Sequence, residues 1–246
     1  MRQHAIVLSE AERAADGILV RKADAREPLT LGDRSMLLAA RQRLALAVAP
    51  DHSHLISLYD LDRGRELLSA PALWFRLELA NAEGTRRTLD SMDFAIPTPV
   101  PQPFPPTAPK LPPPPLDLRF RCKRDSFPGL EVVVRPTLAA DRLSWSLAVN
   151  RVPSGWSLVS VTSPVLEVGA LGGDPGDDRL LLPNGFGRAY PTLNGTRYRG
   201  NYPSGSCCMQ WMGVTDGTSG LYLGAHDATA STKFLDTQGT AGEPRT

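Results

Sequence analysis

Apolar and polar residues alternate along short runs of the chain from residue 43 onward. The runs RLALAVA, HLISLYDL and ALWFRLEL place an apolar side chain at almost every second position, which is the period of a strand with one buried face. Asp62, Arg63 and Gly64 lie between two of these runs, and their residue types favour a turn. The pattern predicts a meander of antiparallel strands in this half of the chain.

The same alternation returns after residue 115. The runs are LDLRFRC, LEVVVRPTLA, RLSWSLAVNRV and WSLVSVTSPVLEVG, divided by turn-forming residues such as Pro128 and Gly129. Strands that recur about every ten residues, without a sustained helical period, are typical of antiparallel sheets packed face to face. We therefore expect an all-β fold, a large antiparallel β-sandwich. From Leu180 onward the chain is rich in Gly, Asn, Tyr and Ser, and we expect long loops around the strands CMQWMGV and GLYLGAH.

Two segments interrupt this organisation. Residues 1–40 show little strand pattern, so we expect a peripheral N-terminal arm, with a short helix that Ser9 caps and Gly17 ends. Residues 97–115 are more than half proline, and proline cannot donate to a sheet ladder. We expect a sandwich domain over residues 41–246 interrupted by this Pro-rich linker. A docking peptide for an aromatic groove on another protein is the alternative for the linker.

Composition narrows the range of partners. The chain has 27 basic and 26 acidic residues and a net charge of +1, which produces no field that would attract nucleic acid or an anionic membrane. No stretch approaches the roughly 20 apolar residues of a membrane span, and Ser9, Glu10 and Glu12 interrupt any apolar core of a signal peptide. We expect neither nucleic acid nor membrane as a partner, and the compartment stays open.

The three cysteines do not form a recognisable framework. Cys207 and Cys208 are adjacent, and Cys122 stands alone, so neither paired disulfides nor spaced metal ligands are indicated. We expect small buried side chains in strands. No metal and no cofactor is predicted.

Several segments resemble a known type of domain when they are taken in order. They are ISLYDLDRGRELLSAPALWFRLEL, RLSWSLAVNRV, LLLPNGFGRAY, NYPSGSCCMQW and GLYLGAHDATAS. Their order is similar to that in the N-terminal sandwich, of galactose-mutarotase type, of bacterial glycoside hydrolases resembling α-galactosidases and endo-α-N-acetylgalactosaminidases. The resemblance covers roughly residues 43 to 234 apart from the proline insert.

In those families the catalytic carboxylates lie on a (β/α)8 barrel that follows the sandwich. Here the segment HDATASTKFL is followed only by a short tail, so the resemblance implies a domain without the barrel. We expect a non-catalytic carbohydrate-binding or scaffold domain, for α-galactosides or mucin-type glycans. A separate catalytic barrel or a second copy of the chain is the expected protein partner.

Candidate binding residues lie in the loop-rich end of the chain. Tyr190 and Tyr202 stand beside proline, and Trp211 follows closely; pyranose rings pack their apolar faces on such aromatic groups. Trp74, Trp145 and Trp156 occur in or beside alternating strands and are expected in the core, which is also the alternative for Trp211. The full set of carbohydrate-binding candidates is Asn184, Arg188, Tyr190, Tyr202, Trp211, His226 and Asp227.

An enzyme is the alternative reading. Glycoside hydrolysis needs two carboxyl groups across the scissile bond, and a mutarotase-like epimerase needs an acid and a base. His226 and Asp227 are the most suggestive pair, although neighbouring strand residues point to opposite faces, and Asp227 starting a turn is the alternative. The other acids in this region are Asp174, Asp177, Asp178 and Asp216, of which the first three are typical of a solvated turn, with weak calcium binding as the alternative. We assign no catalytic residue.

Overall fold

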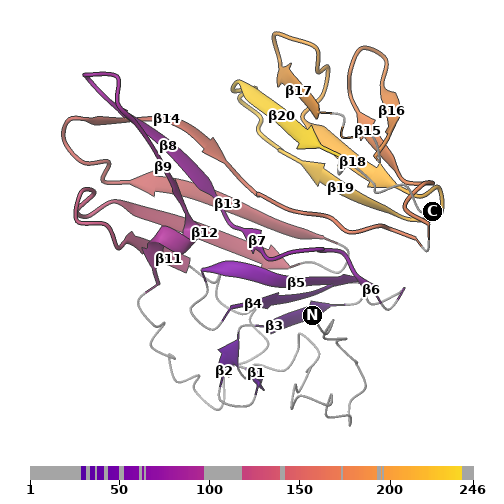
Figure 1. Ribbon diagram of the computed structural model, residues 1–246, viewed down its shortest axis with the longest axis horizontal. Coiled ribbons are helices and arrows are strands. Elements are labelled where there is room, and N and C mark those ends of the chain that lie inside the picture. The colour runs from indigo at the N-terminus through magenta and orange to yellow at the C-terminus, as the bar shows by residue number, and fades with distance from the viewer. Residues whose placement is uncertain are drawn as a thin grey trace. The chain divides into compact units, whose positions relative to one another are not determined.

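The computed structural model confirms the expected all-β class (Figure 1). Among the residues that the structure describes, the regular elements are strands in antiparallel sheets, apart from one short 3-10 helix, η1 (Ser91–Asp93). No helix within the described residues has the length and apolar character needed to cross a membrane. The structure describes residues 29–31, 34–36, 38–41, 44–49, 53–60, 63, 65–96, 118–138, 142–172, 174–192, 195 and 197–239.

The chain divides into two compact units, Met1–Gly169 and Ala170–Thr246. We call them unit 1 and unit 2 and describe each by itself. The sandwich domain expected over residues 41–246, with its arm and linker boundaries, stays a prediction. The Pro-rich segment 97–115 and the helix expected after Ser9 lie outside the described residues.

The described part of unit 1 forms three multi-stranded sheets and a hairpin. The hairpin pairs β1 (Leu29–Leu31) with β2 (Arg34–Met36). One sheet has the order β3 (Leu38–Arg41), β4 (Leu44–Val48), β5 (His54–Asp60) and β6 (Arg65–Glu66), with β7 (Ala72–Leu73) also paired to β5. The second has the order β10 (Phe94–Ala95), β11 (Leu118–Cys122), β12 (Glu131–Leu138) and β13 (Leu143–Asn150). The third has the order β14 (Trp156–Thr162), β8 (Arg76–Asn81) and β9 (Arg86–Asp90).

Strands β1, β2 and β3 correct one expectation about the N-terminal arm. The segment before residue 41 has little strand pattern, yet β3 pairs with β4 in the register Leu38↔Ala47 to Arg41↔Leu44. Pairing with a neighbouring strand satisfies the backbone hydrogen bonds and outweighs a weak local preference. The end of this segment therefore belongs to a sheet.

The core of unit 1 lies between sheets, as the sandwich prediction requires. Phe75 immediately precedes β8, and its ring contacts Phe94 of β10 edge-on at 5.2 Å and Phe120 of β11 at 5.1 Å between centroids. Leu77 and Leu79 of β8 are fully buried beside them. Alternate residues of β8 thus face the sheet that contains β11, and the apolar area removed from water stabilises the pair of sheets.

The three tryptophans expected in the core differ in how deeply they are buried. Trp74 is fully buried, and its ring meets Trp145 of β13 edge-on at 6.2 Å. Trp145 and Trp156 are only partly buried, and Trp156 contacts Phe127 at 4.9 Å. Ser163 joins the first pair, because its Oγ donates to Trp74 O at 2.7 Å and accepts from Trp145 Nε1 at 3.0 Å. The core expectation is therefore fully met only at Trp74.

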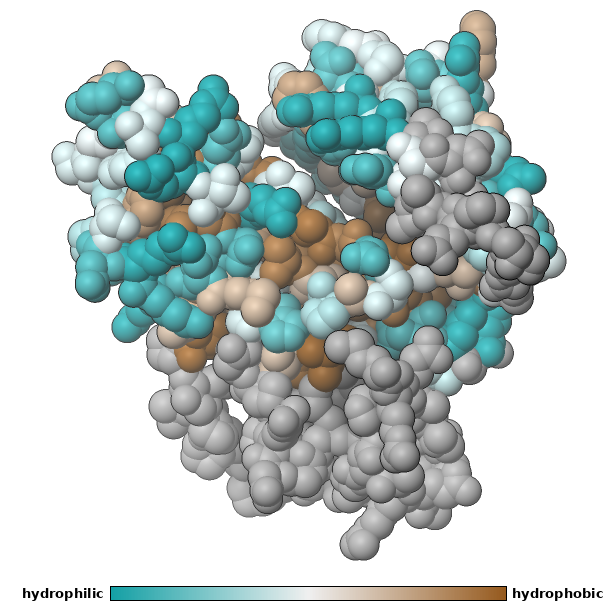
Figure 2. Space-filling model, in the orientation of Figure 1, coloured by the Kyte–Doolittle hydropathy of each residue, from teal (hydrophilic) through white to brown (hydrophobic). Residues whose placement is uncertain are grey.

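Strand β14 forms one edge of its three-stranded sheet. Leu158 and Val161 lie opposite Leu79 and Leu77 in the register and so share their face of the sheet, yet they are 37% and 39% exposed. Figure 2 shows one face of the molecule, where hydrophilic residues cover much of the coloured surface and hydrophobic residues are visible between them. The apolar face at this edge is only partly covered by the described residues.

The described residues of unit 2 form two smaller sheets. One has the order β16 (Arg188–Pro191), β15 (Arg179–Leu182), β18 (Trp211–Thr215) and β19 (Gly220–Gly224), and the other pairs β17 (Arg197–Tyr202) with β20 (Lys233–Gln238). Strands β15, β16, β17 and β20 correct the expectation of long loops here. Gly and Asn weaken the local strand signal of β17, and the other three strands lie between segments rich in turn-forming residues. Pairing along the backbone stabilises these strands where the local pattern is weak.

The three cysteines also differ in burial. Cys207 is buried, as are Leu180, Leu182 and Leu235 of the same unit, whereas Cys122 is half-buried and Cys208 is exposed. The burial expected for all three is therefore wrong for Cys208. Its Sγ lies 3.2 Å from Pro183 O and from Gly185 O, so the exposed thiol donates to the turn between β15 and β16.

Candidate functional site

An open pocket of about 450 Å³ lies within unit 2. Its volume is in the range of small-molecule sites. Four of the candidates named from the sequence line it, namely Tyr202, Trp211, His226 and Asp227. The remaining lining residues are Cys208, Met209, Gln210, Tyr222, Ala225 and Ala228.

Three rings form a row along one side of this pocket. Trp211 begins β18, and Tyr222 lies on the neighbouring strand β19, with their ring centroids 5.9 Å apart and their planes inclined by 29°. The Tyr222 ring in turn lies 6.1 Å from that of His226, at 32°. Tyr222 is 55% exposed. We call Trp211, Tyr222 and His226 the aromatic row.

Gly224 makes room for the aromatic row. It lies directly opposite Trp211 in the β18–β19 register, and a Cβ atom added to it would lie 2.6 Å from Cε1 and Cζ of Tyr222. The Tyr222 ring therefore lies over the backbone at Gly224, in space that any other residue would fill. The close approach of ring to backbone is what places Tyr222 beside both Trp211 and His226.

Tyr222 and Gly224 belong to the candidate site but are not among the residues predicted from the sequence. The available signal is the spacing Tyr222, Gly224, His226, in which every second residue would lie on one face of a strand. The run GLYLGAH has the pattern of an ordinary strand, which does not show that Tyr222 stays at the surface.

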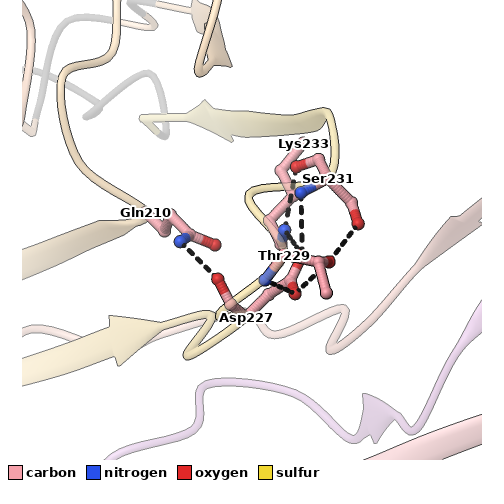
Figure 3. A network of polar contacts seen from close by, with 5 residues as sticks. All are labelled: Gln210, Asp227, Thr229, Ser231 and Lys233. Carbon is pink, nitrogen blue, oxygen red and sulfur yellow. Dashed lines mark hydrogen bonds and ion pairs between the residues drawn. The ribbon is translucent and has the colours of Figure 1, made fainter.

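Asp227 is held in a turn by both of its carboxylate oxygens (Figure 3). Oδ1 accepts from the backbone N–H of Thr229 at 2.8 Å and from its hydroxyl at 2.6 Å. Oδ2 accepts from Ser231 N at 2.9 Å and from Lys233 Nζ at 2.5 Å. The Lys233 ammonium, with the Thr229 donors, holds the pKa of the Asp227 carboxyl well below its usual range. Asp227 starts a turn, as one of the two sequence interpretations had it.

His226 and Asp227 line the same pocket, although neighbouring strand residues were expected to face opposite ways. Strand β19 ends at Gly224, so the alternation of a strand no longer applies two residues later. The His226 ring extends the aromatic row, while the Asp227 carboxylate is directed into its own turn. Both residues line the pocket, but the His226 ring contacts Tyr222 whereas the Asp227 carboxylate binds the turn that follows it.

Gln210 connects the start of β18 to this turn. Its Nε2 donates to the backbone carbonyl of Asp227 at 2.9 Å, as Figure 3 shows. Its Oε1 is buried and has no hydrogen-bond partner among the residues that the structure describes. Beside it, Trp211 Nε1 donates to Met209 Sδ at 3.3 Å. The Gln210 amide thus ties the start of β18 to the Asp227 turn, and its oxygen is out of reach of solvent.

Three sequence candidates do not line the pocket in the described residues. Asn184 forms an isolated backbone bridge with Cys207. Arg188 is exposed on β16. Tyr190 lies on the same strand, with its ring 6.5 Å from that of Tyr198. The aromatic and turn-forming candidates come together, whereas those on the β15–β16 hairpin remain apart from them.

The other acidic candidates are mainly turn residues. Asp216 accepts from Thr218 N at 2.8 Å and from Ser219 N and Oγ at 2.6 and 2.8 Å, and the Ser219 donors hold its pKa well below the usual range. Asp174 and Asp177 are exposed, as a solvated turn requires, but Asp178 is buried and accepts from Leu171 N at 3.2 Å. No group of three or more potential metal ligands lies together within the described ranges.

Comparison with protein-family models finds no match for this chain, and comparison with curated proteins finds none. The resemblance to the sandwich of glycoside hydrolases therefore stays a prediction.

Proposed function

We propose that this chain is a non-catalytic, carbohydrate-binding domain related to the sandwich domains of glycoside hydrolases, and that it binds sugar at the pocket of unit 2. The observation that carries the proposal is the aromatic row on an open pocket. Pyranose rings present flat C–H faces that pack on aromatic rings and leave their hydroxyl groups at the edge for polar partners. Trp211 and Tyr222 offer neighbouring faces of this kind.

The polar groups of the pocket complement this surface. Gln210 lines the pocket and fixes the backbone carbonyl of Asp227 through its Nε2. Tyr202 and Tyr222 carry phenolic hydroxyls that both donate and accept. An apolar face beside a few polar groups is the general composition of a small-molecule site.

The geometry favours binding over acid–base catalysis at this place. A general acid or base works best when its pKa is near the operating pH, and the pKa of Asp227 is held well below its usual range. Both of its oxygens already accept hydrogen bonds from the turn. The carboxylate is therefore occupied with holding the loop, and the epimerase and hydrolase alternatives gain no support from it.

Isothermal titration of the whole chain with α-galactosides and mucin-type glycans tests the proposal. Tyr222→Ala and Trp211→Ala should each weaken binding by about tenfold or more, equivalent to roughly 1.4 kcal/mol. Phe234→Ala is a matched control, because Phe234 is 57% exposed and stacks under Arg199 instead of lining the pocket. It should leave affinity within about twofold.

Two outcomes contradict the proposal. One is the absence of measurable heat with every glycan in the panel. The other is an equal loss of affinity in Tyr222→Ala and Phe234→Ala while urea unfolding shows both variants to be folded.

A further inference from the structure

We infer that the pocket takes an uncharged saccharide and discriminates against acidic ones, such as glycans that carry sialic acid, uronic acid or sulfate. The inference rests on the proposed function and specifies the chemical class of its ligand. Two features of the pocket carry it: the state of its charges and the type of polar group in its lining.

The first feature is an internal ion pair. Asp227 lines the pocket, and its negative charge is already matched by Lys233, whose Nζ contacts Asp227 Oδ2 and also donates to Ser231 O at 2.9 Å. The side chains of Lys233 and Asp227 are 21% and 26% exposed, so both charges are largely removed from solvent. Lys233 can reach an anionic ligand only if it leaves the carboxylate, which would then be an uncompensated, partly buried charge.

No lysine or arginine stands among the described residues that line the pocket. An acidic sugar would therefore lose water around its anion without gaining a charged partner, and it would lie near the carboxylate of Asp227. Binding sites specific for carboxylate or sulfate supply Arg, Lys or several backbone N–H groups for this purpose. The charge arrangement disfavours an anion, and that penalty is a source of specificity.

The second feature is the neutral polar lining. Tyr202 and Tyr222 bring phenolic hydroxyls to the pocket, and these both donate and accept hydrogen bonds. Such groups match the hydroxyls of a sugar, whereas an ionised carboxylate or sulfate is held best by charged side chains or several backbone N–H groups. The lining therefore suits a neutral sugar better than an acidic one.

Titration with a matched pair of glycans tests this inference. The probes are a galactose-terminated oligosaccharide, the same oligosaccharide capped with sialic acid, and the methyl ester of the capped form, which keeps the size and removes the charge. The neutral oligosaccharide should bind at least about tenfold more tightly than the acid, and the ester should recover most of that difference. Equal or tighter binding of the acid, or an ester as weak as the acid, overturns the inference.

A charge-introducing variant provides a second test. Ala228 is exposed and lines the pocket, so Ala228→Lys should shift the affinity ratio toward the acidic glycan by several-fold. Ala189→Lys adds the same charge on an exposed position of β16 outside the lining and should shift the ratio less. An unchanged ratio in Ala228→Lys contradicts the charge argument.

The outcomes also separate the inference from the proposed function. If neither glycan binds, both are overturned. If both glycans bind equally and Trp211→Ala weakens both, the carbohydrate site stands and the discrimination is overturned.

Discussion

The two units place their aromatic residues in opposite environments. In unit 1, Phe75, Phe94 and Phe120 are at most 1% exposed and pack edge to face within the core. In unit 2, Tyr222 is 55% exposed and Phe186 is fully exposed. Both units are built of antiparallel strands, so the difference does not follow from strand content. Aromatic rings stabilise the first unit and provide surface on the second.

Both units hold connections with carboxylates that accept backbone N–H groups. Asp90 and Asp93 do so around η1 in unit 1. In unit 2, Asp216 does so between β18 and β19, and Asp227 does so after β19. Such side-chain to backbone bonds define a turn without a large apolar core. The smaller unit can therefore keep loop residues in place while its rings remain exposed, which is the requirement for a preformed binding surface.

Phe75→Ala should cause the largest loss of stability among the proposed variants. Removing a ring that contacts two others in a closed core costs about 3–5 kcal/mol of the free energy of unfolding. Urea unfolding followed by near-UV circular dichroism measures it. Phe186→Ala is the same chemical change at an exposed site and should alter stability by no more than about 0.5 kcal/mol. Similar losses in both variants would contradict the contrast between the units.

Gly224→Ala should have a small effect on stability and a specific effect on the site. The added methyl group meets the far end of the Tyr222 side chain, which is 55% exposed and can move aside, so the free energy of unfolding should change by no more than about 1 kcal/mol. Displacement of Tyr222 should weaken glycan binding although no aromatic residue is removed. Gly169→Ala is the control, because its added Cβ would meet its neighbours at 3.8 Å or more, an ordinary contact distance. Unchanged glycan affinity in Gly224→Ala would show that the aromatic row does not need this glycine.

Asp227→Asn should produce the smallest change, visible as a difference in acid sensitivity. The pKa of Asp227 is lowered on folding, so its carboxylate contributes stability above the unfolded pKa of about 4 and loses that contribution as pH falls below it. The variant should therefore show a flatter dependence of the urea midpoint on pH between about 5 and 2. Lys233→Met removes the main cause of the shift and should flatten the same range. If the urea midpoint of both variants depends on pH as that of the wild type does, the stabilising role assigned to Asp227 is contradicted.

Part of the candidate site was accessible to sequence reasoning. Trp211 and Tyr202 stand out because aromatic residues beside glycine- and proline-rich segments are uncommon in a core, and both line the pocket. Tyr222 was missed because its run has the pattern of an ordinary strand. Tyr190 was selected for the same reasons as Tyr202, yet it lies against Tyr198, because partner choice depends on which strands pair.

The alternation of apolar residues was sufficient to predict the all-β class and the strands β4, β5, β11, β12, β13 and β19, because one buried face imposes a period of two on the sequence itself. This alternation does not predict how β15, β16, β17 and β20 pair, where the Tyr222 ring lies relative to Gly224, or how Lys233 closes the Asp227 turn. These features depend on contacts between residues whose side chains carry little local preference, and such contacts exist only once the chain is folded.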